Sequence, residues 1–397
     1  MKKEKLLIIN DDENIRDILT LFLKEKQYEV IEAEDGFSGM EQAVKASPDL
    51  ILLDIVMPGL NGYQVCEQLK QNPLTKDIPV IFLSSLTQPM DKIQGLEMGG
   101  VDFITRASDK GELLARVQTH LKISALSKEL KEKNAELVEK QKYLDEDLQV
   151  AASIQSSLLP SKQLKINDLD INWVCSPCNL VGGDIFNIIP INEALVAFYI
   201  LDVSGHGVHS AMVAVSISQF FHQYSGFLAE STINKLASPK AIMDELNKEF
   251  PFERFNEFFT IFYMVLNVQT RALSYTSGGH PPAILLHCRR QLELLSGEDS
   301  AIGINPVESA CHAETIFLEE GDKIVLYTDG IIEYSNQDCD LYGEERFCAL
   351  LESVKHRSSA EIVEAVCLDL KAFSKDKPPL DDISLMVIGY HSPRKGL

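Results

Sequence analysis

Carboxylates beside tight turns are the residues of this 397-residue sequence that are best placed to do chemistry. In the C-terminal part they stand next to strongly apolar runs, where glycine or a second aspartate lets the chain turn sharply. Burying so many carboxylates together would be very costly unless cations neutralised them. Two divalent ions suit phosphate ester hydrolysis, because they position a water, lower its pKa and stabilise charge on phosphoryl oxygens. These residues are Asp184, Asp202, Asp329, Asp381 and Asp382.

A serine and a histidine close to Asp202 suggest a different chemistry. The stretch LDVSGHGVHSAM, residues 201–212, contains Ser204 and His206, a pair that could support nucleophilic catalysis. No nucleophile elbow of the G-x-S-x-G type is present. We therefore interpret Asp202 as a metal ligand and the Gly-His-Gly turn as the segment that lets the backbone approach the site. For His206 the sequence leaves two roles open, assistance in the reaction or stabilisation of the turn.

A second set of acids lies in the first third of the chain. Asp11 and Asp12 follow one apolar run, Asp54 ends another, and Ser84 ends a third. Carboxylates that converge at one edge of a sheet would repel one another unless a cation lay among them. Oxygen ligands favour Mg²⁺, which keeps waters and accepts phosphate oxygens. The alternative, aspartates that cap the following helices, explains one of these acids well and all of them poorly.

The elements that must position these N-terminal acids alternate between strands and helices. Short apolar runs alternate with stretches of helical spacing, which indicates a five-stranded parallel sheet wound with helices on both faces. In such doubly wound α/β folds, sites form at the carboxyl ends of the strands. The expected strands cover residues 6–9, 29–33, 50–54, 79–83 and 102–105.

The C-terminal part has a different plan, an α/β arrangement with much antiparallel sheet. Strong strand patterns cover residues 194–205 and 322–330, and each ends in an aspartate and a turn. Residues 260–287 predict consecutive strands joined by turns at NVQTR and GGHPP. Residues 211–228 predict a buried helix.

Residues 123–150 predict a charged helix without glycine or proline. Leu130, Leu137 and Leu144 are seven residues apart, a spacing suited to the seam of a two-helix coiled coil and hence to a homodimer. The alternatives are a single solvated helix or a hairpin packed on a domain. Because the preceding residues are also helical in pattern, one rod is expected to run from about residue 109 to 158.

Composition narrows the class of protein. A net charge of -22 argues against nucleic-acid binding, which needs basic patches. No apolar run reaches the roughly 18–20 residues that span a bilayer, and no signal peptide is recognisable, so we expect a cytoplasmic protein without membrane contact. Cys175 and Cys178 form a C-x-x-C, but no second pair stands at zinc spacing, so we interpret them as ordinary reduced thiols.

The first third carries three motifs at characteristic spacings, namely NDDE, LLDIVMPGLNG and FLSS. With these motifs, about residues 4–122 resemble the receiver domain of two-component response regulators. The resemblance implies that a sensor histidine kinase supplies the phosphoryl group and that Asp54 accepts it. It also implies a Mg²⁺ ion held by Asp11, Asp12, Asp54 and the Val56 carbonyl.

The same resemblance implies a switch at the end of the sheet. Ser84 would bond the phosphoryl group, and Phe103 would shift on activation. Receivers normally carry lysine and then proline where this chain has Arg106 and Ala107. Because a planar guanidinium does not replace an ammonium neutrally, we expect phosphorylation with an altered coupling from phosphate to output.

Residues 147–391 contain AASIQSSLLP, VGGDIFN, LDVSGHGVHSAM, FFTIFYMVL, SGGHPP, LYTDGIIE and DDIS in this order. With these motifs the segment resembles metal-dependent serine/threonine phosphatases of the PPM/PP2C class, in the bacterial branch of stage II sporulation protein E and the sigma-B regulators. The resemblance implies an α/β/β/α sandwich that binds two Mn²⁺ or Mg²⁺ ions.

The resemblance also implies a role for each acid. Asp202 would bridge the two ions, and the Val203 carbonyl would add a ligand. Asp184 would complete one shell directly or through water. Asp329 would help to hold the other ion, together with either Asp381 or Asp382. His280 resembles scaffolding of this family.

We therefore expect three segments: a receiver over residues 1–122, a helical coiled-coil linker over 123–150, and a phosphatase over 151–393. Phosphorylation of Asp54 would control dephosphorylation of a phosphoserine or phosphothreonine, on an anti-sigma-factor antagonist with a STAS domain. The alternative is a non-catalytic adaptor that binds a sigma or anti-sigma factor. A transcription factor is excluded by the acidic charge and by the absence of a helix-turn-helix signal.

Overall fold

The chain forms two compact units, Met1–Lys142 and Tyr143–Leu397, called here the N-terminal and the C-terminal unit. The structure is a computed structural model. It describes residues 3–84, 95–105, 109–162, 166, 169–205, 207–225, 230–297, 300–304 and 312–390.

The N-terminal unit is built on a five-stranded parallel sheet in the order β2-β1-β3-β4-β5. All five predicted strands are confirmed, with ends that differ by at most one residue. They are β1 (Lys5–Ile9), β2 (Glu29–Ala33), β3 (Leu50–Asp54), β4 (Val80–Ser84) and β5 (Asp102–Thr105).

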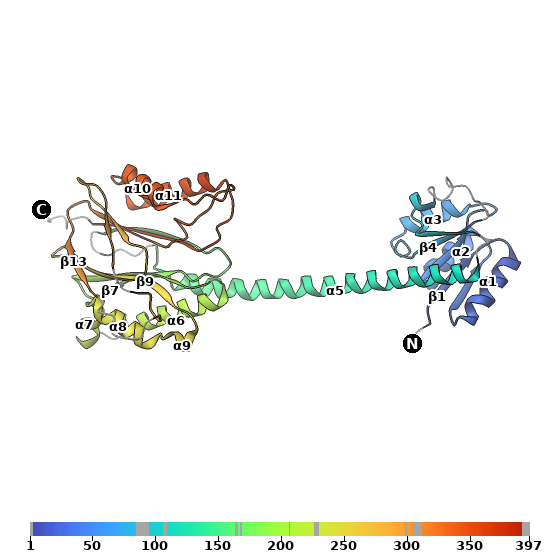
Figure 1. The fold of residues 1–397 in the computed structure, drawn as a ribbon, viewed down its shortest axis with the longest axis horizontal. Coiled ribbons are helices and arrows are strands. Elements are labelled where there is room, and N and C mark those ends of the chain that lie inside the picture. Colours follow the sequence, from blue (N-terminus) through green and yellow to red (C-terminus); the bar gives the residue numbers. More distant parts are fainter. Residues whose placement is uncertain are drawn as a thin grey trace. The chain divides into compact units, whose positions relative to one another are not determined.

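Helices cover both faces of this sheet (Figure 1). Side chains alternate across the strands, so Leu7 and Ile9 pack with helices α2 and α3, while Leu6 and Ile8 pack with α1 and α5. The predicted doubly wound fold is therefore confirmed. These helices are α1 (Glu13–Glu25), α2 (Gly36–Ala46), α3 (Gly62–Gln71) and α5 (Lys110–Ser157).

Helix α5 is 48 residues long and confirms the prediction of one rod from about residue 109 to 158. The predicted segment boundaries at 122 and 150 both fall inside it and stay predictions. Leu113, Val117 and Leu121 are buried against the sheet. The predicted dimer seam stays a prediction, and its residues Leu130 and Leu137 are 72% and 64% exposed in the single chain. Among the described residues, no helix is both long and apolar enough to cross a membrane.

The C-terminal unit contains two antiparallel sheets of five strands each. Their orders are β13-β10-β9-β8-β7 and β12-β11-β14-β15-β6. The strands are β6 (Leu169–Ser176), β7 (Ile185–Pro190), β8 (Leu195–Val203), β9 (Phe259–Asn267), β10 (Ala272–Gly278), β11 (Ala283–Leu286), β12 (Glu293–Leu295), β13 (Glu314–Phe317), β14 (Lys323–Tyr327) and β15 (Ile383–Tyr390).

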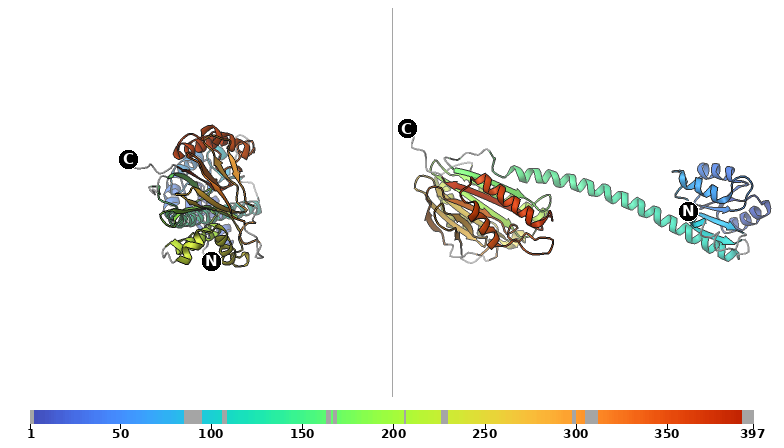
Figure 2. Two further views of the ribbon diagram at one scale, coloured as in Figure 1. Left: turned by 90° about the vertical axis from the view of Figure 1, so that its left-hand side faces the viewer. Right: turned by 90° about the horizontal axis from the view of Figure 1, so that it is seen from above.

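Helices cover the outer face of each sheet, so the layers run α/β/β/α as predicted (Figure 2). Phe198 and Phe262 pack between the sheets, against Leu326 of the other sheet. The neighbouring residues of the same strands, such as Tyr199, face the outer helices. These helices are α6 (Val208–Ser225), α7 (Glu230–Leu236), α8 (Pro239–Glu249) and α9 (Phe252–Phe255) on one side and α10 (Glu344–Val354) and α11 (Ser359–Ser374) on the other.

Two local predictions need refinement. The helix expected to be buried over 211–228 is α6, and only one of its faces is buried, since Met212 is 58% exposed while Ala214 is fully buried. The turn at NVQTR joins β9 and β10 within one sheet, whereas GGHPP carries the chain from β10 into the other sheet at β11. Sequence spacing alone did not separate these two kinds of turn.

Candidate metal and phosphoryl-transfer sites

The strands of both sheets bring the predicted C-terminal aspartates to one place. Asp202 is the penultimate residue of β8, and Asp184 directly precedes β7, which pairs with β8. Asp329 follows β14, and Asp381 lies just before β15, its pairing partner. Each sheet therefore contributes acids from the ends of two adjacent antiparallel strands.

Polar contacts link these ends across the sandwich. The Thr328 hydroxyl donates a hydrogen bond of 2.8 Å to Asp184 Oδ2. The backbone at Gly183 also lies close to the end of β8. A Cβ atom on this residue would lie 2.7 Å from the Val203 carbonyl oxygen and 3.3 Å from Asp202 Oδ1. Glycine is thus required at this position, because any side chain would displace the backbone that presents the Val203 carbonyl.

The Asp382 carboxylate accepts hydrogen bonds from the backbone around Gly183. Its side chain is 3% exposed, and Oδ2 accepts hydrogen bonds from the N–H groups of Gly183 and Asp184, at 2.6 and 3.4 Å. Oδ1 accepts one from the Cys178 N–H at 2.8 Å. Three backbone donors therefore hold this carboxylate, whereas its neighbour Asp381 is less buried.

The acids interact strongly through their charges. Burial raises the pKa of Asp202 to about 9, and nearby carboxylates add to the shift. Burial and carboxylate neighbours also raise the pKa values of Asp184 and Asp329. A divalent cation would reverse this repulsion, and oxygen donors of this kind fit Mg²⁺ or Mn²⁺. The carboxylates that act on Asp202 are Asp184, Asp329, Asp381 and Asp382.

A cysteine lies beside the same acids, a placement that the sequence did not predict. In the part of the chain that the structure describes, one group of three potential ligands has all its ligand atoms within 4.8 Å of one another: Cys178, Asp381 and Asp382. Burial raises the pKa of the Cys178 thiol to about 11, and the two carboxylates add to this. The sequence signal was the position of Cys178 six residues before Asp184.

Ser204 and a histidine share a carboxylate instead of forming a nucleophile and its base. The Ser204 hydroxyl donates to one oxygen of Glu257, and His209 Nδ1 lies 2.9 Å from the other. The serine is thus bonded to an acceptor that is not an imidazole, which removes the argument for nucleophilic catalysis. Glu257 and His209 were not predicted, and His206 lies outside the described residues.

His280 has a structural role, as predicted. Its side chain is 7% exposed, its Nδ1 lies 2.8 Å from the Thr260 hydroxyl, and its Nε2 lies 3.1 Å from the Tyr327 carbonyl oxygen. Burial lowers its pKa to about 3, so the ring is neutral and donates from Nε2. Since Thr260 and Tyr327 belong to different sheets, His280 fastens the GGHPP turn between them.

The N-terminal acids gather at the carboxyl edge of the parallel sheet. Asp54 ends β3 and is fully buried, and its Oδ1 accepts the Ile55 N–H at 2.8 Å. Because β1 pairs with β3 in parallel, the Asp11–Asp12 turn leaves the sheet beside Asp54. Asp12 caps α1 by accepting hydrogen bonds from the first turn, so the capping alternative holds for this residue. The three carboxylates do not come within 4.8 Å of one another as a group.

The predicted switch residues are only partly described. Phe103 is 9% exposed, and its ring centroid lies 5.8 Å from that of Phe82 in the core. Val56 is 55% exposed on the turn after β3. Arg106 and the side chain of Ser84 lie outside the described part of the structure.

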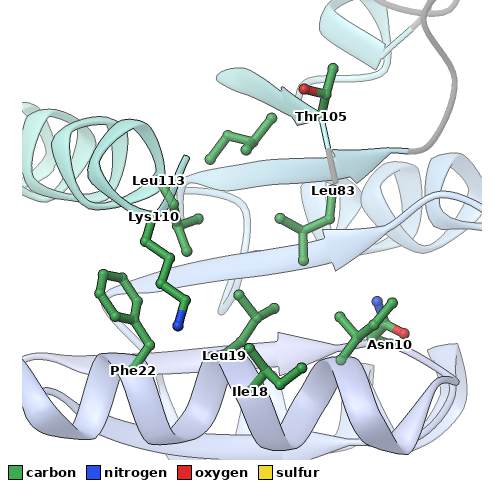
Figure 3. A pocket seen from close by; sticks show the side chains of 10 residues that line it. Asn10, Ile18, Leu19, Phe22, Leu83, Thr105, Lys110 and Leu113 are labelled. Atoms are coloured by element: carbon green, nitrogen blue, oxygen red, sulfur yellow. The ribbon is translucent and has the colours of Figure 1, made fainter. Parts of the chain in front are cut away.

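A cavity of about 230 Å³ lies between α1 and α5 in the same unit (Figure 3). Its walls are mostly apolar, including Leu19 and Phe22, and its polar members are Asn10, Thr105 and Lys110. The Asn10 side chain is fully buried, and its Oδ1 accepts the Asp12 N–H at 2.9 Å. This lining does not suit a metal or a phosphoryl group, so the cavity is separate from the acid site.

Comparison with known protein families assigns both units. The model of stage II sporulation protein E (SpoIIE) matches residues 192–391, just over half of the chain. The chain belongs to the SpoIIE family. The response regulator receiver domain matches residues 6–118. The predicted combination, a receiver joined to a SpoIIE-type unit of the PPM/PP2C phosphatase class, is thereby confirmed.

Individual relatives resemble one unit each. The DNA-binding dual master transcriptional regulator RpaA of Synechocystis is 42% identical over 118 residues, which are 30% of this chain and 49% of RpaA. The response regulator PleD of Caulobacter vibrioides is 39% identical over 33% of this chain and 29% of PleD. The SpoIIE-family chain thus spans half or less of the length of these curated relatives.

A solved structure supports the fold of the SpoIIE-type unit. The SiaA-PP2C domain of Pseudomonas aeruginosa matches with a TM-score of 0.55 at 20% identity. The match covers 63% of this chain and 98% of that domain. At this identity the likeness establishes the PP2C fold and leaves the roles of individual residues to the site itself.

Proposed function

We propose that this SpoIIE-family protein is a response regulator whose output is metal-dependent hydrolysis of a phosphate ester on a protein serine or threonine. The convergence of acids from both sheets carries the proposal. Asp184 and Asp202 come from one sheet, Asp329 and Asp381 from the other, and their charges act on one another. An adaptor without activity would have no need for this costly arrangement.

Each acid has a proposed role. Asp202 and the Val203 carbonyl would hold Mn²⁺ or Mg²⁺ ions at the centre of the group. Asp184, which the Thr328 hydroxyl orients, and Asp329 would add carboxylate ligands from the two sheets. When bound, the ions supply a water of lowered pKa and positive charge for the phosphoryl oxygens.

Between the two neighbouring acids, we assign the ligand role to Asp381. Asp382 already accepts three backbone N–H groups, which makes it the brace of the Cys178–Asp184 loop. A carboxylate that is bonded in this way is oriented toward the backbone and adds rigidity around the metal ligands.

The N-terminal unit receives the signal in this proposal. A sensor histidine kinase supplies a phosphoryl group to Asp54, with Mg²⁺ held by Asp11, Asp12, Asp54 and the Val56 carbonyl. Helix α5 begins on the receiver sheet and continues into the SpoIIE-type unit, so it is the proposed route of control. The exposed leucines of α5 would pair two chains as a homodimer.

The proposed substrate is a phosphoserine or phosphothreonine on an anti-sigma-factor antagonist with a STAS domain. Membership of the SpoIIE family supports this choice. The acidic net charge of -22 supports a protein substrate over nucleic acid.

Phosphate release from a phosphoserine peptide and from p-nitrophenyl phosphate tests the proposal. The full chain is measured with Mn²⁺, with Mg²⁺ and with a chelator. We expect activity only with metal, and an Asp202→Asn variant should lose at least about 100-fold in rate, because a charge at the centre of the site is removed. Asp338→Asn, on an exposed turn, is the matched control. A rate close to wild type in Asp202→Asn would refute the two-metal proposal.

A further inference from the structure

The thiol of Cys178 lies within reach of the proposed metal site. Cys178 follows β6, 204 residues before Asp382, yet its Sγ atom and the carboxylate oxygens of Asp381 and Asp382 all lie within 4.8 Å of one another. The backbone keeps it there, because its N–H donates to Asp382 Oδ1 at 2.8 Å.

These separations suit a shared metal ion. A metal–sulfur bond is about 2.3 Å long and a metal–oxygen bond about 2.1 Å, so a sulfur and an oxygen on one ion lie at most about 4.4 Å apart. The Cys178 sulfur and the Asp381 oxygen, which lie within 4.8 Å of each other, thus need to close by at most about 0.4 Å to bind one ion from opposite sides, and by at most about 1.2 Å to bind it at the tetrahedral angle.

The other cysteine of the C-x-x-C does not take part. Cys175 lies in β6 opposite Ser384 of β15, and the Ser384 hydroxyl lies 3.5 Å from its sulfur. Among the described residues, it is not in the group that Cys178 forms with the carboxylates. The two cysteines therefore lie in different surroundings: Cys175 is part of the sheet, and Cys178 lies beside the carboxylates of Asp381 and Asp382.

We propose that Cys178 is a thiolate ligand of the ion that Asp381 holds. On binding, the S–H bond breaks, its proton passes to solvent, and a sulfur–metal bond forms. This inference rests on the proposed function only in placing an ion at Asp381.

The ligand changes which ions the site prefers. Carboxylate and carbonyl oxygens suit Mg²⁺ and Mn²⁺, whereas a thiolate favours softer ions such as Zn²⁺, Co²⁺ and Cd²⁺. A site of mixed sulfur and oxygen donors therefore takes the softer divalent ions more tightly than an oxygen-only site of the same charge.

Optical titration of the metal-free, reduced full chain with Co²⁺ tests the inference. A thiolate–cobalt bond gives a near-ultraviolet charge-transfer band that carboxylates do not give. We expect this band in wild type, its loss in Cys178→Ser, and its retention in Cys339→Ser, which changes an exposed cysteine elsewhere. Cd²⁺ affinity should fall at least about tenfold in Cys178→Ser, with a much smaller change for Mg²⁺.

A second variant guards against misfolding. Cys178→Asp replaces sulfur by oxygen and should bind Co²⁺ without the band. A wild-type spectrum that lacks the band, or a band that persists in Cys178→Ser, would overturn the inference. Mn²⁺-dependent phosphate release, measured on the same wild-type sample, reports the proposed function separately, so a band without hydrolysis refutes the function and leaves the ligand assignment intact.

Discussion

Asp11 and Asp12 of the receiver and the acids of the SpoIIE-type unit are the same residue type in opposite environments. In the receiver, Asp11 and Asp12 are exposed, and Asp12 is bonded to the first turn of α1. In the SpoIIE-type unit, Asp184 is 4% exposed, and burial with neighbouring carboxylates raises the pKa of Asp202 to about 9.

The difference teaches what each site requires in order to fold. Water reaches Asp11 and Asp12, and backbone N–H groups bond Asp12, so these two acids need no cation to offset burial. The acids of the SpoIIE-type unit destabilise the metal-free fold, because burial and repulsion both oppose their ionisation. Divalent ions should therefore contribute to stability in the second unit far more than in the first.

The largest expected effect tests this contrast directly. Mn²⁺ at about 100 times its Kd should raise the free energy of unfolding of the SpoIIE-type unit by about 2.7 kcal/mol, and Asp202→Asn should remove most of this gain. Trp173, the one tryptophan of the chain, lies in β6 of that unit and reports its unfolding by fluorescence. If Mn²⁺ stabilised the wild-type protein and the Asp202→Asn variant equally, the acids of the SpoIIE-type unit would not depend on a bound ion for stability.

The same variant should be more stable than wild type without metal, by at least about 1 kcal/mol at pH 8. The folded pKa of Asp202 lies above its ordinary value, so the stability linked to this group is complete at about pH 4 and is lost as pH rises toward 9. Asparagine does not titrate, so the difference in free energy of unfolding between the variant and the wild type should widen as pH rises. A difference that stays constant from pH 5 to 8 would contradict this reasoning.

An intermediate effect is expected in the receiver. Asp12→Ala removes a helix cap and should cost about 1 kcal/mol, whereas Asp12→Asn keeps the cap and should change stability by under about 0.5 kcal/mol. Both should slow Mg²⁺-dependent phosphorylation of Asp54 by an acyl phosphate. Hydrogen exchange across α1 measures the change in stability, and intact mass measures the phosphorylation of Asp54. The control is Asp17→Asn on the same helix. Unchanged phosphorylation in both variants would remove Asp12 from the proposed Mg²⁺ site.

The smallest effect on chain stability is expected in the helix that joins the two sites. Leu137 is 64% exposed, so Leu137→Glu should change the free energy of unfolding by under about 0.5 kcal/mol. If α5 pairs two chains, the variant should nonetheless weaken the dimer. Light scattering measures the mass of the particle in solution and so detects loss of the dimer. The control is Leu368→Glu, which changes a similarly exposed leucine of α11. A monomeric wild type, with and without phosphate on Asp54, would refute the pairing.

Much of the fold was predictable because it follows from local patterns of burial. The five receiver strands were predicted within one residue, since each is an apolar run bounded by polar turns. The continuous rod of α5 followed from an uninterrupted helical stretch. The predicted burial of α6 was wrong for one face, because a high apolar content does not reveal that Val208 and Met212 face away from the sheet.

The sequence by itself predicted the acids of both units as candidate ligands, because each stands where a strand must end and turn. Only the tertiary structure decided how the acids divide their tasks. Asp382 became a brace because the pairing of β15 with β6 brings the Cys178 N–H to it from 204 residues away. Ser204 donates a hydrogen bond to Glu257 because the pairing of β8 with β9 brings these two residues together. Hydrogen bonds of this kind depend on positions in space, and periodicity along the chain carries no information about them.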